Sequence, residues 1–269
     1  MTARLLRYLV KGAAGLTLGS LATVVGYILI RGIPHLRPEL FETEYTTQNV
    51  SMLPAIVNTL IMTAVSLVVA LPLGVFAAVY LVEYARRGSR LVALIRVTAE
   101  TLAGIPSIIY GLFGLLFFVT ALKMGFSILA GAVTLALMIL PLVLRTTEEA
   151  LQAVPDLYRE GAFGLGAGRL RTVFRIVLPS AAPGILAGVI LAVGRIVGET
   201  AALLYTAGTV ANFPKGLLSS GRTLSVHMFA LASEGMYLDQ SYATAVVLLV
   251  VVFAINALSG SIAKRITKG

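Results

Sequence analysis

Long apolar stretches alternate with short charged ones along the 269 residues. Six stretches are long enough to cross a hydrocarbon core of ~30 Å as helices, at about 1.5 Å per residue. They cover residues 12–30, 53–82, 101–122, 124–144, 176–205 and 240–263. The pattern predicts an all-α membrane protein with six transmembrane helices, the third of which is broken by Gly104 and Pro106.

The first stretch has two interpretations. It could be a signal peptide, because three cationic residues precede it. However, its apolar run is longer than such a peptide needs, and no A-x-A cleavage site follows. We therefore expect residues 1–31 to form a transmembrane helix outside the core, and residues 32–52 to form an external segment. The main transmembrane domain is then residues 53–264.

Composition supports a membrane protein and excludes several kinds of site. The chain is 58% hydrophobic and 12% charged, whereas soluble domains carry about 25% charged residues. It has no cysteine, which excludes disulfides, thiolate metal sites and cysteine nucleophiles. His35 and His227 are far apart and form no ligand cluster; a packed or exposed His227 is favoured over a ligand.

The net charge of +9 fits a membrane orientation better than a nucleic-acid partner, and we expect no nucleic acid to bind. Lysine and arginine gather on the cytoplasmic side of membrane proteins. With a cytoplasmic N-terminus, fifteen of the 21 lysines and arginines lie inside, five lie outside, and Arg195 lies within a span. The prediction is that both termini are cytoplasmic, including a tail at residues 265–269, and that the lipid bilayer surrounds the chain.

The charged loop at residues 146–179 is longer than most connections between helices. Pro155 should end any helix that continues from the fourth span, and Asp156 should cap a new one. Gly164 and Gly166 allow a sharp turn. The loop therefore predicts two short helices joined at glycine.

The second of these helices should be amphipathic. Leu170, Val173, Phe174 and Val177 recur at helical spacing and predict one apolar stripe. We expect Leu178 and Pro179 to stop this helix before the fifth span. Such a pair of helices could present an apolar knob to a groove on a partner, whereas a simple connecting loop would need neither the stripe nor the glycine turn.

The loop also contains the pattern E-x-A-x(3)-G-x(9)-I-x-L-P. This pattern resembles the EAA loop of ABC importer permeases, which docks the membrane subunit onto a separate ATPase. The second motif position is glycine instead of alanine, which should weaken the first helix. The motif positions are Glu160, Gly161, Ala162, Gly166, Ile176, Leu178 and Pro179.

The resemblance implies the type I importer (MetI-like) permease fold, with coupling helices seated in a cleft of the ATPase. The chain has no Walker A sequence G-x(4)-G-K-[ST], so it has no such phosphate-cradling loop of its own. We therefore expect a permease and not an enzyme. This chain should bind no cofactor, and the partner ATPase should use ATP and Mg²⁺.

Two further stretches resemble the phosphate-specific transport permeases. They are residues 104–115 and residues 192–208, and the GETAALLYTAG continuation in the second is similar to the A-type subunit. Residues 145–151 and 224–228 also resemble that subunit. The resemblance implies import of inorganic phosphate by alternating access through a bacterial or archaeal plasma membrane. The implied partners are a C-type permease forming a heterodimer, a cytosolic ABC ATPase dimer and an extracytoplasmic phosphate-binding protein.

Arg195 is the candidate with the strongest physical argument. A charge inside a span costs at least ~2.5 kcal/mol on insertion scales, so it needs a partner or a function. Glu199 lies one helical turn later and could neutralise it. Arg195 and Glu199 could line an anion path, or they could form a pair that packs against a neighbouring helix. Gly194 and Gly198 would favour such close packing.

Two other residues are weaker candidates for the substrate path. Arg145, at the inner end of the fourth span, could contact the exiting anion or only extend to the membrane surface. Ser107 could cap a restarted helix whose positive end faces the path, or it could merely follow a packing kink.

Three rival functions remain open at this point. A permease for sulfate, molybdate or phosphonate would share the EAA-type loop, and only residues 104–115 and 192–208 favour phosphate. An ion-driven secondary transporter or channel would need no ATPase-docking loop. A membrane scaffold would need no charged residues in mid-span.

Overall fold

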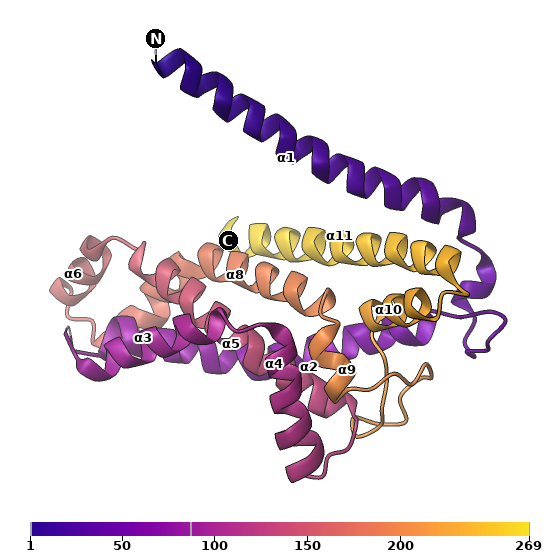
Figure 1. The fold of residues 1–269 in the computed structure, drawn as a ribbon. Coiled ribbons are helices and arrows are strands. Elements are labelled where there is room, and N and C mark those ends of the chain that lie inside the picture. Colours follow the sequence, from indigo (N-terminus) through magenta and orange to yellow (C-terminus); the bar gives the residue numbers. More distant parts are fainter. Residues whose placement is uncertain (1, 87, 269) are drawn as a thin grey trace.

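The computed structural model describes residues 2–86 and 88–268, and every regular element within them is helical (Figure 1). Arg87, one of the predicted cytoplasmic cations, and Gly269 lie outside the described residues. The α-helices are α1 (Thr2–Gly32), α2 (Leu53–Val79), α3 (Arg90–Ala103), α4 (Ser107–Gly114), α5 (Ile128–Gln152), α6 (Asp156–Gly164), α7 (Arg169–Thr172), α8 (Leu178–Val197), α9 (Ala201–Thr206), α10 (Leu224–Glu234) and α11 (Leu238–Lys268).

Several of these helices are joined by short π-helical or 3₁₀-helical segments. Three of them are π-helical and continue an α-helix: η3 (Tyr80–Tyr84), η4 (Leu115–Ala121) and η5 (Val173–Val177). Two 3₁₀ turns, η1 (Ile33–His35) and η2 (Pro38–Phe41), lie in the predicted external segment.

The prediction of six spans is confirmed once the third span is counted with its break. Five helical segments are long and apolar enough to cross a membrane, and α3 with the α4–η4 segment makes a sixth that is bent by 100°. In Figure 1 the N-terminal end of α1 and the C-terminal end of α11 both point toward the side of the molecule that carries α6, away from the segment between α1 and α2. This arrangement agrees with the prediction that the termini share a side with the charged loop.

The third span differs from its predicted course. A break at Gly104 and Pro106 within residues 101–122 was expected and is present, but the helix that precedes it begins at Arg90 and stops at Ala103. Gly104 closes that helix, and Pro106 then forces an extended backbone (φ −58°, ψ 139°) before the chain turns away. The α4–η4 segment projects from the bundle in Figure 1 and contains three mutually packed phenylalanines, Phe113, Phe117 and Phe118.

The core lies between α2, α5 and α8, with α4 and α9 closing one side. Small residues let these helices approach closely. A Cβ at Gly114 would collide with Thr134 of α5 and Thr206 of α9, and one at Gly188 would collide with Thr146. Close backbone packing of this kind is typical of helices in membranes, where association depends on van der Waals contact.

The C-terminal end of helix α1 packs against α11. The rings of Tyr27 and Tyr242 meet edge-on with centroids 5.8 Å apart, and Gly32 touches the backbone at Tyr242. Most apolar side chains of α1 from Leu5 onward are exposed. Within a bilayer these side chains would contact lipid.

Polar residues are buried at the opposite end of the molecule from α6, beneath the segment that precedes α2. One of them is His227 of α10, whose side chain is fully enclosed. Burial, together with the neighbouring positive charge of Arg222, lowers the pKa of His227 to about 3. This histidine is therefore neutral at physiological pH, in agreement with the packed interpretation.

This burial makes stability depend on pH. The unfolded chain takes up a proton on this histidine near pH 6.5, whereas the folded chain does not until about pH 3. The contribution of neutral His227 to the free energy of unfolding is therefore complete above pH 6.5, and it decreases as the pH falls below that value. Lowering the pH from 7 to 5 should destabilise the wild type by about 2 kcal/mol more than the His227→Gln variant.

Thermal unfolding of both purified proteins in detergent between pH 7 and pH 4 measures this difference. Equal acid shifts in the two midpoints would show that His227 gains its proton as readily when folded as when unfolded.

Candidate functional site

The charged loop folds as two helical segments that meet at a glycine turn, as predicted. Helix α5 ends at Gln152, just before Pro155, and α6 follows as the first segment. Gly166 makes the turn with φ +82°, a left-handed conformation that favours glycine. The second segment begins at Arg169. The fourth span therefore extends beyond residue 144, and its last two turns belong to the loop.

Three details of the predicted loop are wrong. The first is the cap at Asp156, since Pro155 occupies the N-cap position and Asp156 is the first residue of α6. The Asp156 carboxylate instead accepts a hydrogen bond from Arg159 Nη1 at 3.2 Å. It still lies where the positive end of the helix dipole favours an acidic group.

The second error concerns Pro179, which does not stop the helix. Residues Arg169–Val197 form one continuous span in which α7, η5 and α8 follow each other. A proline inside a helix lacks an N–H and its ring presses on the preceding turn. The wide π-helical turn η5 lies immediately before Leu178 and Pro179 and gives that ring room.

The third error is the apolar stripe, which the same π-helical turn divides. Val173 and Val177 are buried against α2 and α5, whereas Leu170 and Phe174 are exposed. A π-helical turn holds more residues than an α-helical turn, so residues three apart no longer share a face, whereas the i, i+4 pairs Leu170/Phe174 and Val173/Val177 each remain together. One part of the predicted stripe therefore fixes the loop to the bundle, and the other part faces outward.

The motif residues divide in the same way. Ala162 is buried, Ile176 and Leu178 are half-buried, and Glu160, Gly161 and Pro179 are exposed. No atom lies within 4 Å of the Cβ that an alanine would carry at residue 161, so the departure from the pattern reflects no steric need for glycine.

Exposed apolar side chains surround the motif in the loop. Leu165, at the tip, is 92% exposed and Leu157 is 75% exposed. Phe163 and Leu170 are also exposed. Such a patch on a cytoplasmic loop is typical of a surface that another protein covers.

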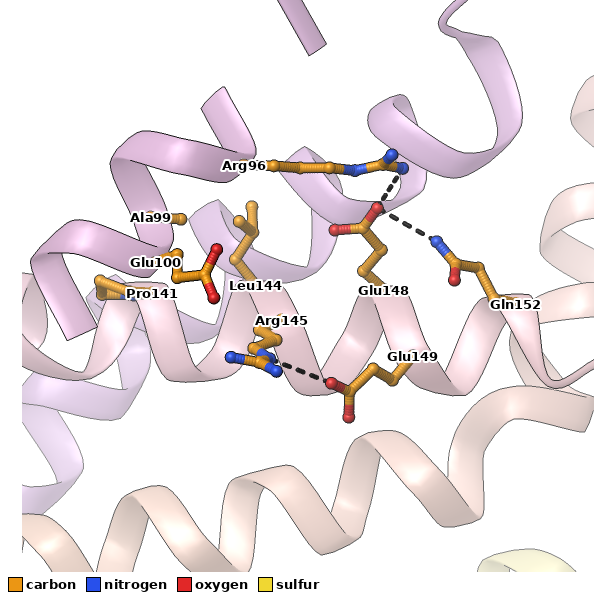
Figure 2. A pocket seen from close by; sticks show the side chains of 9 residues that line it. All are labelled: Arg96, Ala99, Glu100, Pro141, Leu144, Arg145, Glu148, Glu149 and Gln152. Carbon is orange, nitrogen blue, oxygen red and sulfur yellow. Dashed lines mark hydrogen bonds and ion pairs between the residues drawn. The ribbon is translucent and has the colours of Figure 1, made fainter. Parts of the chain in front are cut away.

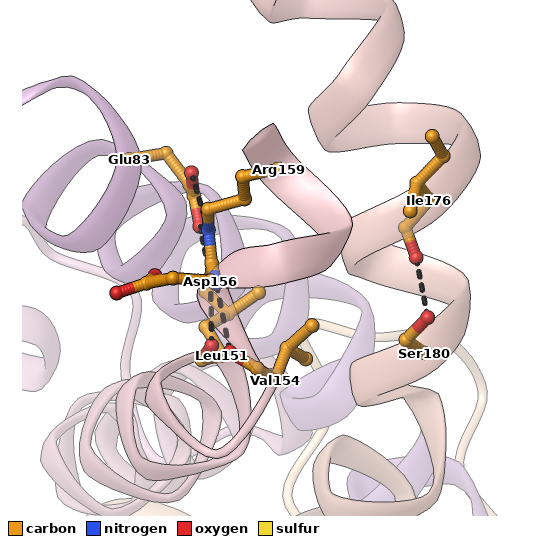
Figure 3. Close-up of polar contacts among 7 residues, drawn as sticks. All are labelled: Glu83, Leu151, Val154, Asp156, Arg159, Ile176 and Ser180. Atoms are coloured by element: carbon orange, nitrogen blue, oxygen red, sulfur yellow. Dashed lines mark hydrogen bonds and ion pairs between the residues drawn. The ribbon is translucent and has the colours of Figure 1, made fainter. Parts of the chain in front are cut away.

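Arg159 fixes α6 to the rest of the molecule (Figure 3). Its guanidinium pairs with Glu83 of η3 at 2.7 Å and 3.1 Å. It also donates to the carbonyl oxygens of Leu151 and Val154, at 2.9 Å and 2.8 Å, at the end of α5. Both charged side chains are largely buried. A single side chain thus joins the ends of α2 and α5 to the first helix of the loop.

Neither member of this pair was predicted from the sequence. The available signal was weak: Glu83 is the only acidic residue among the arginines of residues 83–90. Nothing in the spacing indicates which of the distant arginines it pairs with.

A pocket of about 300 Å³ opens between α3 and α5 near the cytoplasmic end and contains Arg145 (Figure 2). The Nε of Arg145 donates to Glu149 Oε1 at 3.0 Å, and both side chains are exposed. On the other side of the pocket, Arg96 pairs with Glu148, although Glu100 lies one helical turn after it. Figure 2 shows these two ion pairs side by side, so the arginine charges here are largely neutralised.

Arg195 lies where the fifth span breaks. Helix α8 ends at Val197, and α9 restarts at Ala201. The expected ion pair between Arg195 and Glu199 is absent from the described structure. Glu199 instead accepts a hydrogen bond from the backbone N–H of Ala202 at 3.0 Å, which caps α9.

The glycines beside Arg195 also behave differently from the prediction. Nothing lies within 4 Å of a Cβ placed on Gly194, and Gly198 meets only the carbonyl of that residue. The expected small-residue packing is therefore not made among the described residues. Arg195 is half-buried beside an open helix face, and no residue of the described chain forms an ion pair with it.

Ser107 begins α4 directly after the break in the third span, with a half-buried side chain. Its predicted role as a cap is wrong, because Pro106 occupies the N-cap position and no side chain caps this helix. Helix α4 packs closely on α9, since a Cβ at Gly111 would touch the backbone of Ala202. The breaks in the third and fifth spans are therefore neighbours.

Comparison with known proteins agrees with this architecture. A family model described as "Binding-protein-dependent transport system inner membrane component" matches residues 70–268. The probable ABC transporter permease protein YqgI of Bacillus subtilis is 33% identical over 250 residues, which cover 86% of this chain and 85% of that protein.

Proteins named as phosphate transport permeases are also similar. Phosphate transport system permease protein PstA of Pasteurella multocida is 39% identical over 200 residues, or 70% of this chain and 71% of that protein. PstA 1 of Mycobacterium tuberculosis is 42% identical over 154 residues, and the match spans 57% of this chain and only half of that relative. The resemblance to this group of permeases is confirmed.

Two solved structures share the fold. The membrane chain of a bacterial alginate ABC transporter, in complex with a periplasmic protein, superposes with a TM-score of 0.72 at 16% identity and covers 98% of this chain and 95% of that chain. A chain of the MetNI methionine ABC transporter gives 0.61 at 19% identity, covering 90% and 97%. The chain therefore belongs to the family of binding-protein-dependent inner-membrane transport components, the multi-pass permease subunits of ABC importers.

Proposed function

We propose that the chain is the A-type permease of an importer that moves inorganic phosphate into the cytoplasm. The main evidence for an anionic substrate is Arg195, which lies at the break between α8 and α9 and has no ion-pair partner among the described residues. A cation inside a membrane-spanning segment is costly unless a partner or ligand compensates it. An anion in transit provides that compensation, and several relatives are named as phosphate transport permeases.

The open face of α8 supports a second permease as partner. Gly194 and the exposed Gly198 present a surface that lets another helix approach closely, yet no residue in the described part of the chain occupies it. A homologous C-type permease seated there would enclose Arg195 between two subunits. The transport path then lies at the interface of a heterodimer.

The loop at residues 146–179 is the proposed contact with the ATPase. The apolar side chains of Leu157, Leu165 and Leu170 are exposed on it, whereas Ala162 between them is buried. One ATPase of a cytosolic dimer would cover these apolar side chains, and a second would bind the partner permease. ATP and Mg²⁺ belong to those ATPases, and an extracytoplasmic phosphate-binding protein delivers the substrate.

Arg159 would transmit a movement of the ATPase contact at α6 to the membrane-spanning helices. A push on α6 reaches α2 and α5 through short hydrogen bonds and a buried ion pair, without a flexible linker between them. Helix α2 and α5 form the core with α8, which carries Arg195. Closure of the ATPase dimer would therefore move the helices on both sides of the path together, as alternating access requires.

Replacement of Arg195 tests the substrate path. Arg195→Ala should abolish phosphate uptake by the complete transporter in proteoliposomes supplied with ATP and the phosphate-loaded binding protein. The complex should still assemble, because no contact within this chain depends on the guanidinium. Arg195→Lys keeps the charge and should retain part of the uptake. Normal uptake by the alanine variant would contradict the role of Arg195.

Replacement of the Arg159 pair tests the coupling route. Glu83→Gln and Arg159→Gln each leave one buried charge without its partner, which should cost about 3 kcal/mol of stability. Each should also reduce transport per ATP hydrolysed. The double variant leaves no unpaired buried charge, so its stability should be closer to that of the wild type than the stability of either single variant. Its transport per ATP hydrolysed should remain low, because the link between α6 and the membrane helices is still missing.

The ratio of phosphate imported to ATP hydrolysed measures this effect, and unfolding midpoints control for stability. Glu149→Gln breaks the exposed pair with Arg145 and is the matched control, because exposed pairs contribute about 1 kcal/mol or less. An unchanged transport ratio in both single variants would contradict a coupling role for the pair.

A further inference from the structure

A cavity of about 710 Å³ opens where the charged loop meets the membrane domain. Its walls come from η3 and the connection after it, from the first turns of α3, from the end of α5, and from α6 and α7. Figure 3 shows the Arg159–Glu83 ion pair, which forms part of one wall. Four arginines from different parts of the chain line the cavity: Arg86, Arg96, Arg159 and Arg169.

Two of these arginines are already compensated within the chain. Arg159 donates to Glu83, to Asp156 and to two backbone carbonyl oxygens at the end of α5. These contacts use every N–H group of its guanidinium. Glu83 and Asp156 are also the carboxylates that line the cavity, and both bind Arg159. Arg96 pairs with Glu148.

Arg86 and Arg169 have no such compensation. Both residues are exposed, and neither forms an ion pair with a carboxylate in the described part of the chain. The guanidinium carbon of Arg169 lies 5.2 Å from the centroid of the Tyr84 ring, at the end of η3, and this contact holds the charge at the cavity. Two uncompensated charges of one sign that face the same cavity raise the local concentration of anions.

The two available guanidinium groups favour a particular kind of anion. A guanidinium is planar, and its N–H donors match the spacing of two oxygens on a phosphate group, so it binds phosphate through paired hydrogen bonds. The cavity is larger than a single phosphate group, so it also has room for a substituent on that group.

The cavity lies beside a source of phosphate groups. Helix α3 is the first half of the third span, and the apolar side chains of Leu91, Leu94 and Val97 are exposed on it. Within a bilayer these side chains would contact lipid, so the cavity opens next to the cytoplasmic layer of headgroups. Basic pockets between membrane helices on this side bind anionic lipid headgroups. Inorganic phosphate in the cytoplasm carries the same group.

We propose that this cavity is a cytoplasmic binding site for a phosphate group, held between Arg86 and Arg169 and supplied by an anionic lipid headgroup or by inorganic phosphate. The site is separate from Arg195. It goes beyond the proposed function, because it does not depend on which solute is imported. Arg86 precedes α3, whereas Arg169 begins the second helical segment of the loop. A bound anion attracts both, so it would hold the loop close to α3 beside the Arg159–Glu83 pair.

Binding of two probes to the purified, delipidated complex tests the site. The complex includes the partner permease and the ATPase, and it carries Arg195→Ala so that the transport path adds no bound phosphate. Native mass spectrometry counts bound phosphatidylglycerol, with zwitterionic phosphatidylcholine as the reference lipid. Equilibrium dialysis measures bound radiolabelled inorganic phosphate. We expect this complex to bind phosphatidylglycerol in preference to phosphatidylcholine, or to bind inorganic phosphate.

Replacement of the two arginines shows whether the probe binds in the cavity. The double variant Arg86→Gln/Arg169→Gln should weaken binding of that probe at least about tenfold, because it removes charge-assisted hydrogen bonds. Arg171→Gln is the matched control, since it removes the same charge from the same short helix. Arg171 is exposed but does not line the cavity, so binding should be unchanged.

Gel filtration checks the assembly of each variant. If the double variant does not assemble, the two single variants take its place, and each should weaken binding by a smaller factor. Loss of phosphatidylglycerol binding identifies a lipid headgroup as the source, and loss of inorganic phosphate binding identifies the free anion. Equal binding with and without the two arginines would overturn the inference, as would an equal loss in Arg171→Gln. Absence of both probes from the assembled complex would also overturn it, because partner subunits would then fill the cavity.

Phosphate uptake by the complex with an intact Arg195, in proteoliposomes with ATP and the binding protein, tests the proposed function separately. If uptake is absent while binding that depends on Arg86 and Arg169 is present, only the proposed function fails. If uptake is normal and the double variant binds both probes as before, only the cavity site fails.

Discussion

A hydrocarbon interior provides no water to backbone N–H and C=O groups, so each interruption of a helix must satisfy these groups from within the protein. The fifth span shows how this constraint determines the candidate site. When the helix breaks after Val197, the Glu199 carboxylate caps the restarted α9 and Ser225 binds the freed carbonyl of Glu199. Because the Glu199 carboxylate binds the backbone of α9, it does not pair with Arg195, although the two residues are four positions apart in the sequence.

The same need to satisfy backbone groups explains where the other helix breaks and the π-helical turn lie. The third span breaks at Gly104 and Pro106 where α4 packs closely on α9, so the two interrupted spans support each other. The π-helical turn η5 lets the fifth span continue past Pro179 from the cytoplasmic loop into the membrane. Because this helix is continuous, a movement of the loop is transmitted directly along α8 toward Arg195.

The cytoplasmic loop is held by charge and not by apolar packing alone. Arg159 satisfies one carboxylate and two carbonyls at once, and these groups belong to the ends of different membrane helices. A guanidinium suits this position because its planar array of donors can serve several acceptors in fixed geometry. The apolar tip near Leu165 can then remain exposed for a partner while the base of the loop stays rigid.

Much of the fold could be predicted from the sequence, because hydrophobic length and charge asymmetry are properties of local segments. The six spans, the break at Pro106 and the turn at Gly166 follow from such local signals. The contact between Arg159 and Glu83 joins residues 76 positions apart, and no local pattern indicates it.

Local spacing was misleading for the candidate site. A separation of four residues suggests a pair between Arg195 and Glu199 only if the helix is continuous, and here it ends between them. In the same way, the stripe from Leu170 to Val177 assumes an α-helical period, which the π-helical turn changes. The cavity lined by Arg86 and Arg169 depends on several distant segments coming together, so it could be found only in the folded structure.

The absence of cysteine from the chain allows a direct test of the central claim that the loop docks an ATPase. A single Leu165→Cys substitution places one thiol at the exposed tip of the loop in an otherwise cysteine-free subunit. Cross-linking in membranes that contain the complete transporter should join this subunit to its ABC ATPase. A cysteine placed at exposed Phe253 of α11 should give no such product. Failure of the Leu165→Cys subunit to cross-link to the ATPase in an assembled, transporting complex would contradict the account.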